Sequence, residues 1–305
     1  MTQVLEKKRT FRDVPKVSLE ELTFDVETMQ VKDVVECYKR WGCVVVRGLN
    51  RAFAPSILKD VNRLVDEGIE QLEHAEKVPA GWMTPNGILW LPAPKNYERE
   101  KQVMVIPLNY KTSGSFFQSA LNPAQLDIVE GIVGPNIELK DNGQCLCKEP
   151  VGGHPKNLHQ DGSYFKHKYE GPVAVLSYAQ DTTVEMGALR IIPGSHKLGL
   201  LPHTDTFSHL GLDLEDWPWE SALTIEGKAG DAIFFHINCI HGSKTNQSEK
   251  RRAVFIHRYR DPEDYTIVQG HSTDQLEEQA EAEGEVRKDD YNFLVRGFRS
   301  IDRTK

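Results

Sequence analysis

The chain has 305 residues, of which 39% are hydrophobic and 27% charged, as in folded globular proteins rather than fibrous or disordered ones. It carries 37 basic and 45 acidic residues, a formal net charge of −8, and no basic stripe. This balance argues against a nucleic-acid-binding protein, because neutralising phosphates requires clustered Lys and Arg.

The charged N-terminus is not followed by an apolar run, so we expect no secretory signal. No stretch of the chain approaches the length of a membrane span. The five cysteines are odd in number, scattered, and form no CxxC pair, which is typical of reduced thiols. We therefore expect a cytoplasmic protein without a membrane partner.

The first part of the chain alternates helical and strand-like patterns. Apolar residues at helical spacing predict a helix from about Met29 to Trp41, and the run Cys43–Val46 predicts a buried strand. A second apolar stripe predicts a helix from Ala54 to Glu76. From Gly81 to Ser115, four prolines and little periodicity predict an ordered loop region instead of a helix or a sheet. Residues 1–135 are thus expected to form a helical and loop-rich N-terminal part.

The second half contains short apolar runs bounded by turn residues, with no long helical pattern between them. This arrangement favours an antiparallel sandwich or barrel over a parallel sheet. We predict a single domain over 1–305, with its core at about 136–262 and a C-terminal extension at 263–305, in which Asp274–Glu285 forms an exposed helix. The predicted core strands are Ile137–Cys147, Val173–Gln180, Leu189–Ile192, Ala232–His236 and Val254–Tyr259.

Two short segments about eighty residues apart contain candidate metal ligands. On a strand, alternate side chains share a face, so His159 and Asp161 should project together while Gln160 points away. His241 lies between an apolar run and a turn, where it can supply a third ligand. Two imidazoles and one carboxylate form the facial set of non-haem Fe(II) oxygenases, which leaves coordination positions open. Taken alone, each motif arises often by chance in a chain with eleven histidines.

Arg251 and Arg252 follow His241 closely enough in the sequence for a hairpin to bring one of them back beside the metal. A guanidinium there can hold a carboxylate through two parallel hydrogen bonds. The alternative is a solvated basic edge, which we expect for Arg251. For Arg252 the residues alone leave both interpretations open.

Several blocks occur in an order that resembles the phytanoyl-CoA dioxygenase family of Fe(II)/2-oxoglutarate-dependent oxygenases. The resemblance covers roughly 137–259, with a weaker echo at Trp41–Gly48. Its blocks are Leu158–Asp161, Asp181–Leu189, Ile192–His196, Ala229–Asp231 and His241–Ser243 with Asn246, Ser248 and Arg252.

The resemblance implies a mainly β protein with flanking helices and a double-stranded β-helix (jelly-roll, cupin-like) core. It implies that iron is bound by His159, Asp161 and His241, and that Arg252 pairs with the distal carboxylate of 2-oxoglutarate. Ser243 is expected to hydrogen-bond nearby, and Gln144 is a further cosubstrate candidate.

The block that ends at His196 is interpreted as a structural turn, so His196 is not expected to be a ligand. The implied reaction uses O₂ and oxidises, in the simplest case hydroxylates, an unactivated C–H bond of a small-molecule metabolite. Succinate and CO₂ are released. The retained carboxylate of Asp161 argues against halogenation, because halogenating relatives have a small residue there.

The chain also departs from the family pattern. Val175–Tyr178 lacks the tryptophan that often lies near 2-oxoglutarate, and the upstream polar anchor is placed only in the neighbourhood of Arg99 and Lys101. The segment His203–Glu226 is expected to cap the site. Aromatic residues, and one histidine, are candidates for the substrate wall, although core packing is the alternative for each; they are Trp82, Trp90, Phe116, Phe117, Tyr164, Phe165, His167, Trp217 and Trp219, with Tyr164 and Phe165 preferred.

Two other functions remain open at this point. A non-oxidative metal enzyme of the same fold, such as a cupin-type isomerase, needs the metal ligands but no 2-oxoglutarate clamp. A catalytically silent binding protein predicts a damaged ligand set, whereas all three ligands are present. No basic cluster indicates a coenzyme A nucleotide, which favours a smaller or apolar metabolite over an acyl-CoA ester.

Overall fold

The computed structural model describes residues 8–140, 143–206, 210–269 and 292–300. The helix expected at Asp274–Glu285 therefore lies outside the described residues. Within them, no helix combines the length and the apolar character that crossing a membrane requires.

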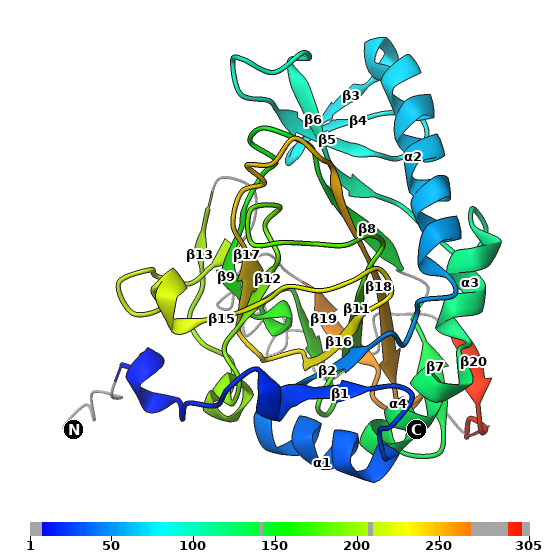
Figure 1. Cartoon of the computed structure of the whole chain (residues 1–305), viewed down its shortest axis with the longest axis vertical. Coiled ribbons are helices and arrows are strands. Elements are labelled where there is room, and N and C mark those ends of the chain that lie inside the picture. Colours follow the sequence, from blue (N-terminus) through cyan, green and yellow to red (C-terminus); the bar gives the residue numbers. More distant parts are fainter. Residues whose placement is uncertain (1–7, 141–142, 207–209, 270–291, 301–305) are drawn as a thin grey trace.

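The core consists of a large sheet that faces a small one (Figure 1). The large sheet has the strand order β1-β2-β16-β11-β18-β8-β6-β5-β4-β3, with β7 and β20 attached beside β18, and the small sheet has the order β15-β12-β17-β9. The strands of the large sheet are β1 (Thr23–Asp25), β2 (Cys43–Arg47), β3 (Glu76–Val78), β4 (Gly81–Met83), β5 (Leu89–Pro92), β6 (Lys101–Ile106), β7 (Ile137–Leu139), β8 (Gln144–Lys148), β11 (Val173–Tyr178), β16 (Ala232–His236), β18 (Arg252–Arg260) and β20 (Phe293–Arg296).

The small sheet carries the short strands around the metal motifs. Its members are β9 (Lys156–His159), β12 (Leu189–Ile191), β15 (Leu223–Ile225) and β17 (His241–Ser243). Two further pairs lie beside it, namely β10 (Phe165–His167) with β19 (Thr266–Gln269), and β13 (Thr204–Asp205) with β14 (Leu210–Gly211).

The predicted antiparallel core is confirmed by the pairing of the central strands. Val173 of β11 lies opposite His236 of β16 on one side and Tyr259 of β18 on the other. Every residue of β11 and β18 is buried, because one face of this sheet packs on helices and the other faces the small sheet. Burial on both faces explains why β11 and the first half of β18, from Ala253 to Ile256, appear in the sequence as apolar runs.

Four helices cover the outer side of the large sheet, where α1 and α4 lie together and α2 runs along one end (Figure 1). Helix α1 ends as predicted, because Gly42 takes a left-handed φ of 69° and donates its N–H to the Tyr38 carbonyl. Helix α2 ends earlier than predicted, since the chain turns into β3 after a short 3₁₀ segment. The helices are α1 (Val31–Trp41), α2 (Ala54–Glu70), α3 (Gly114–Ala120) and α4 (Pro123–Val133).

The prediction of a loop region instead of a sheet over Gly81–Ser115 is wrong at three strands within this segment. The chain there forms β4, β5 and β6, which extend the large sheet through antiparallel pairs from β8 outward. The prolines fall between strands or at their ends, as with Pro92 at the end of β5, so they mark boundaries without preventing a sheet. Each strand is too short to show periodicity on its own.

Candidate metal centre

The three predicted ligands converge in the structure. His159 ends β9, His241 begins β17, and the two residues lie opposite each other in the pairing of these strands. The Oδ1 atom of Asp161 lies 3.6 Å from Nε2 of His159 and 3.7 Å from Nε2 of His241. One potential ligand atom of each residue lies within 4.8 Å of the others, and no second such trio occurs within the described ranges.

Asp161 departs from the prediction in its secondary structure. The strand ends at His159, and Asp161 begins a 3₁₀ turn over Asp161–Ser163. Gln160 between them keeps an extended backbone, with φ −115° and ψ 133°, so the alternation still holds. The Gln160 side chain points away from the trio and donates hydrogen bonds to the carbonyls of Gly199 and Asn238.

Backbone carbonyls orient both imidazoles. Nδ1 of His159 lies 2.7 Å from the Asn157 carbonyl, and Nδ1 of His241 lies 3.0 Å from the Cys239 carbonyl. Because a carbonyl only accepts hydrogen bonds, each Nδ1 carries the proton and each Nε2 keeps a free lone pair. Both Nε2 atoms face Asp161, as metal ligation requires.

The charges of the trio also suit a divalent cation. Burial and the neighbouring His159 lower the pKa of His241 to about 4, so that ring is neutral at pH 7. Burial opposes ionisation of Asp161, but the contacts with His159, His241 and Arg258 outweigh it and hold the pKa of that carboxyl well below its usual value. Two imidazole nitrogens and one carboxylate on one side form a donor set that fits Fe(II).

A cavity of about 620 Å³ opens beside the trio, between the large and small sheets. Strand β18 contributes four of its lining residues, Arg252, Val254, Ile256 and Arg258. These four residues alternate along the strand, and alternate residues of a strand face the same side, so all four face the cavity. The cavity therefore has an arginine at each end of one strand face and apolar residues between them.

The predicted cosubstrate residues all line this cavity. Arg252 is only 2% exposed, and its Nε has no hydrogen-bond partner among the described residues. Ser243 lines the cavity from β17, and Gln144 from β8, where it pairs with Ile256. A buried, unpartnered guanidinium is costly unless a ligand supplies a partner, so this end of the cavity fits a carboxylate.

Two lining residues, Lys156 and Arg258, were missed in the sequence. Nη2 of Arg258 lies 3.4 Å from Oδ2 of Asp161, and its even spacing from Arg252 was a usable signal. Lys156 had no such signal, because an odd separation from His159 places it on the other face of a regular strand. The β9–β17 register shifts by one residue here, so both residues face the cavity.

The upstream arginine and lysine do not reach the cavity. Nη2 of Arg99 lies 2.6 Å from Oε1 of Glu149, and the Lys101 ammonium lies over the Trp82 ring. The expectation for Arg251 is wrong, since its guanidinium is partly buried and contacts Asn62 and Glu149. Glu149 is fully buried, so its carboxylate needs these arginines as partners.

The turn predicted around His196 is present. Gly194 has a left-handed φ of 84° and precedes a 3₁₀ segment over Ser195–Leu198. The His196 ring lies beside His236, and His196 does not line the cavity.

Only two of the proposed wall residues, Tyr164 and Phe165, line the cavity. Trp90, Phe116 and Trp217 are buried in the hydrophobic clusters, and the other four also lie outside the lining. From the segment expected to cap the site, the lining includes Asp205, Thr206 and Leu210. The tryptophan that family members often carry near 2-oxoglutarate is missing from β11, and Leu176 of this strand lines the cavity instead.

The comparisons with known proteins agree with this site. The phytanoyl-CoA dioxygenase (PhyH) family model matches residues 38–254. The peroxisomal phytanoyl-CoA dioxygenase of Bos taurus is 28% identical over 196 residues, which cover 60% of this chain and 57% of that protein. The probable alpha-ketoglutarate-dependent hypophosphite dioxygenase of Stutzerimonas stutzeri is 27% identical over 143 residues, 44% of this chain and 49% of that protein. The chain thus spans about half the length of the curated relatives it matches.

Solved structures with the same architecture include two enzymes of nogalamycin biosynthesis. The non-heme alpha ketoglutarate dependent carbocyclase SnoK has a TM-score of 0.59 at 17% identity, over 90% of this chain and 97% of that one. The epimerase SnoN has a TM-score of 0.57 at 19% identity, over 87% and 98%. These likenesses confirm the predicted jelly-roll class. The cytoplasmic location stays a prediction, since the mammalian relatives are named as peroxisomal.

The matched family model spans well over half of the residues and includes all three converging side chains. The chain therefore belongs to the phytanoyl-CoA dioxygenase family of Fe(II)- and 2-oxoglutarate-dependent oxygenases.

Proposed function

We propose that the protein oxidises, in the simplest case hydroxylates, an unactivated C–H bond of a small molecule, with release of succinate and CO₂. The observation that carries this proposal is the buried Arg252, whose Nε has no hydrogen-bond partner within the described ranges, in the same cavity as the facial trio. A metal site alone serves many reactions, whereas a metal site joined to a carboxylate clamp serves a keto-acid cosubstrate.

In this proposal His159, Asp161 and His241 hold Fe(II) through two Nε2 atoms and one carboxylate oxygen. The carbonyls of Asn157 and Cys239 keep both rings in the ligating tautomer. Bound iron and 2-oxoglutarate supply the activation of O₂ and the oxidation itself, and the protein supplies binding and orientation.

The distal carboxylate of the cosubstrate is assigned to Arg252 and Ser243. Lys156 lies opposite Ser243 in the strand pairing and adds a second cation at this end. Burial lowers the pKa of Lys156 to about 8, which leaves its ammonium mostly protonated at neutral pH. Gln144 is retained as a further hydrogen-bonding group on the opposite wall.

Apolar side chains line the cavity between its charged groups. Leu146, Leu176, Phe235, Val254 and Ile256 come from neighbouring strands of the large sheet. They exclude water around the bound groups, which strengthens the electrostatic contacts and limits side reactions.

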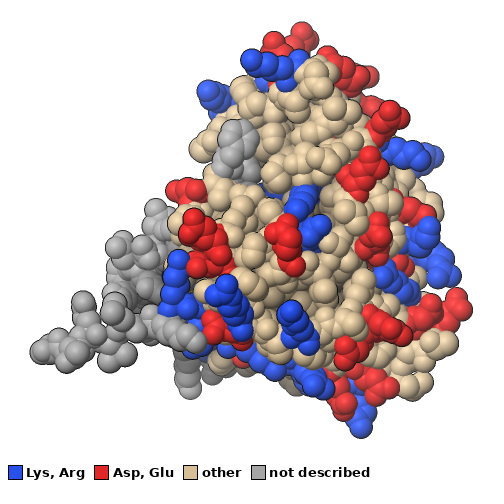
Figure 2. All heavy atoms as spheres, turned by 60° about the vertical axis from the view of Figure 1, so that its left-hand side comes forward, with Lys and Arg blue, Asp and Glu red and all other residues tan. Residues whose placement is uncertain are grey.

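A small molecule is the favoured type of substrate. Lys and Arg side chains alternate with Asp and Glu over the face shown in Figure 2, so this face carries no extended basic surface for a nucleic acid. No observation favours a non-oxidative isomerase or a silent binding protein over the oxygenase.

The test is an anaerobic titration of the apoprotein with Fe(II) and then 2-oxoglutarate, followed by visible absorption. We expect a weak charge-transfer band that requires both components, because a chelating keto acid creates a new transition at the iron. The Asp161→Ala variant serves as the control and should give no band. Metal binding without a band after 2-oxoglutarate addition would contradict the proposal and favour a non-oxidative enzyme.

A further inference from the structure

We propose that the substrate carries an anionic group, a carboxylate or a phosphorus oxyanion, which Arg258 binds beside the metal centre. This inference rests on the proposed function, since it takes Arg252 to be occupied by the cosubstrate. It adds the chemical class of the substrate and the residue that recognises it.

Arg258 is a buried cation on the wall of the cavity. Arg258 is 7% exposed, and its Nε is buried without a hydrogen-bond partner in the described part of the chain. Among the described residues, the guanidinium makes one polar contact, the 3.4 Å approach of Nη2 to Oδ2 of Asp161. Charge-assisted hydrogen bonds are normally about 2.7–2.9 Å long, so this contact leaves most of the donor capacity unused.

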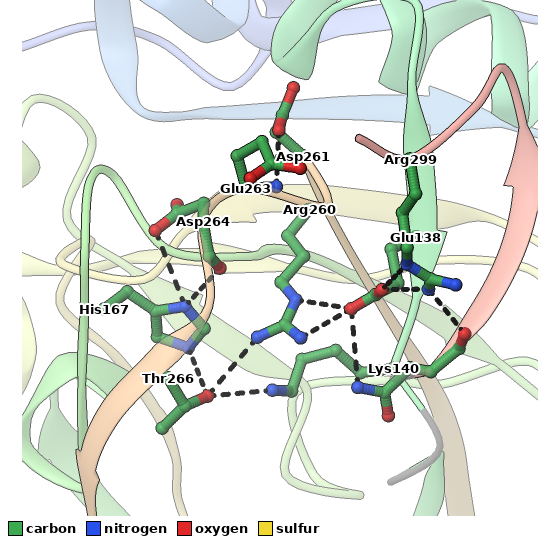
Figure 3. A network of polar contacts seen from close by, with 10 residues as sticks. Glu138, Lys140, His167, Arg260, Asp261, Glu263, Asp264, Thr266 and Arg299 are labelled. Carbon is green, nitrogen blue, oxygen red and sulfur yellow. Dashed lines mark hydrogen bonds and ion pairs between the residues drawn. The ribbon is translucent and has the colours of Figure 1, made fainter. Parts of the chain in front are cut away.

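The neighbouring Arg260 shows what a satisfied arginine looks like on the same strand. Its Nε and Nη2 lie 2.9 and 2.5 Å from Oε1 of Glu138, and Nη1 reaches Thr266 (Figure 3). Arg299 binds the other oxygen of Glu138 and completes the network. The fold thus gives Arg260 a buried carboxylate at normal hydrogen-bond length, whereas the carboxylate contact of Arg258 is long and its guanidinium faces the cavity.

The charges of the loaded cavity also call for an anion. A divalent metal and the side chains of Lys156, Arg252 and Arg258 carry five positive charges, and Asp161, Asp205 and doubly charged 2-oxoglutarate carry four negative ones. Asp205 is exposed at the rim, so the deep part of the cavity has the larger positive excess. An anionic substrate corrects this imbalance at low desolvation cost to the protein.

The position of Arg258 suits a substrate anchor. Arg252 and Arg258 are six residues apart on one strand face, roughly 20 Å along the backbone, so the two serve different parts of the cavity. Because Arg258 contacts the ligand Asp161, a molecule anchored on it has its carbon atoms next to the iron. A planar fork of donors also fixes the orientation of a carboxylate or phosphorus oxyanion.

The test measures binding to protein loaded with Zn(II) and 2-oxoglutarate, by isothermal titration calorimetry. The probes are hexanoate, hexylphosphonate and the neutral hexanamide. We expect both anions to bind at least tenfold more tightly than the amide. Arg258→Gln should lose at least tenfold for the anions and leave amide binding unchanged. Arg63→Gln, the same charge change on exposed α2, should behave as the wild type.

Equal binding of anions and amide, or no binding of any probe, would overturn the inference. So would a loss of 2-oxoglutarate or Zn(II) affinity in Arg258→Gln, because Arg258 would then serve the cosubstrate or merely orient Asp161. Absence of the Fe(II)/2-oxoglutarate band in the wild type rejects the proposed function instead. A normal band without any anion preference rejects this inference alone.

Discussion

Replacing Arg252 by methionine should separate cosubstrate binding from folding. The guanidinium is buried and its Nε has no partner among the residues that the structure describes, so removing the charge relieves a desolvation penalty when 2-oxoglutarate is absent. Methionine keeps most of the side-chain volume and fills the space with an apolar chain. The variant should therefore fold normally, bind iron, and lose its affinity for 2-oxoglutarate.

The magnitudes follow from the burial of the charge. Removing one partner of a buried, hydrogen-bonded charge pair costs about 2–5 kcal/mol of binding free energy, which is roughly a 30-fold to few-thousand-fold rise in Kd. Without 2-oxoglutarate, the free energy of unfolding should be unchanged or higher by up to about 4 kcal/mol. At 2-oxoglutarate concentrations of 100 times the wild-type Kd, the wild type should gain about 2.7 kcal/mol and the variant less than about 1 kcal/mol.

Urea unfolding of the Zn(II)-loaded proteins, with and without 2-oxoglutarate, measures these quantities. Arg251→Gln is the matched control on the adjacent residue, because Arg251 pairs with Glu149 outside the cavity. That control should lose stability and keep the full response to 2-oxoglutarate. If Arg252→Met still gains the wild-type stabilisation from 2-oxoglutarate, the assignment of the clamp is wrong.

Three further predictions address the metal, the core and the pH response. His159→Ala should abolish iron binding and turnover because it removes a ligand, and iron retained at the wild-type ratio by elemental analysis would refute the assignment. Glu138→Gln should lower the free energy of unfolding by about 3–5 kcal/mol, since it removes the buried carboxylate charge that faces the buried Arg260; a change below 1 kcal/mol in urea unfolding would contradict this. Burial lowers the pKa of His257 to about 3, so the unfolded chain binds the extra proton, and stability present above pH 6.5 should be lost as pH falls, by about 2 kcal/mol at pH 5. His257→Gln should show a correspondingly smaller loss between pH 7.5 and pH 5, and an equal loss would rule out His257 as its source.

Local sequence patterns predicted the structure correctly where the conformation of a residue depends on its immediate neighbours. The end of α1 at Gly42 required only a residue that tolerates a left-handed φ. The strands β11 and β16 required only short apolar runs that a buried sheet accepts. The candidate ligands His159 and His241 were found from the ordered set of family motifs, because each motif taken alone arises often by chance.

Contacts between distant segments decided the rest, because they depend on register and packing that no local pattern encodes. The strands β4 to β6 form because β8 offers an edge to pair with, although their own sequences show only prolines and irregular spacing. Most of the aromatic residues predicted for the substrate wall pack in the hydrophobic clusters instead, since burial in a well-packed cluster competes with exposure to a cavity.

The sequence by itself predicted the candidate metal ligands, the antiparallel core and the family, because each depends on residue identities in a fixed order. Only the tertiary structure decided which cations face the cavity. A one-residue register shift turns Lys156 inward, and the contact of Arg258 with Asp161 joins a strand to a 3₁₀ turn almost a hundred residues away in the sequence. Side-chain direction on a strand changes completely with a shift of one residue, so these positions are set by pairing between strands.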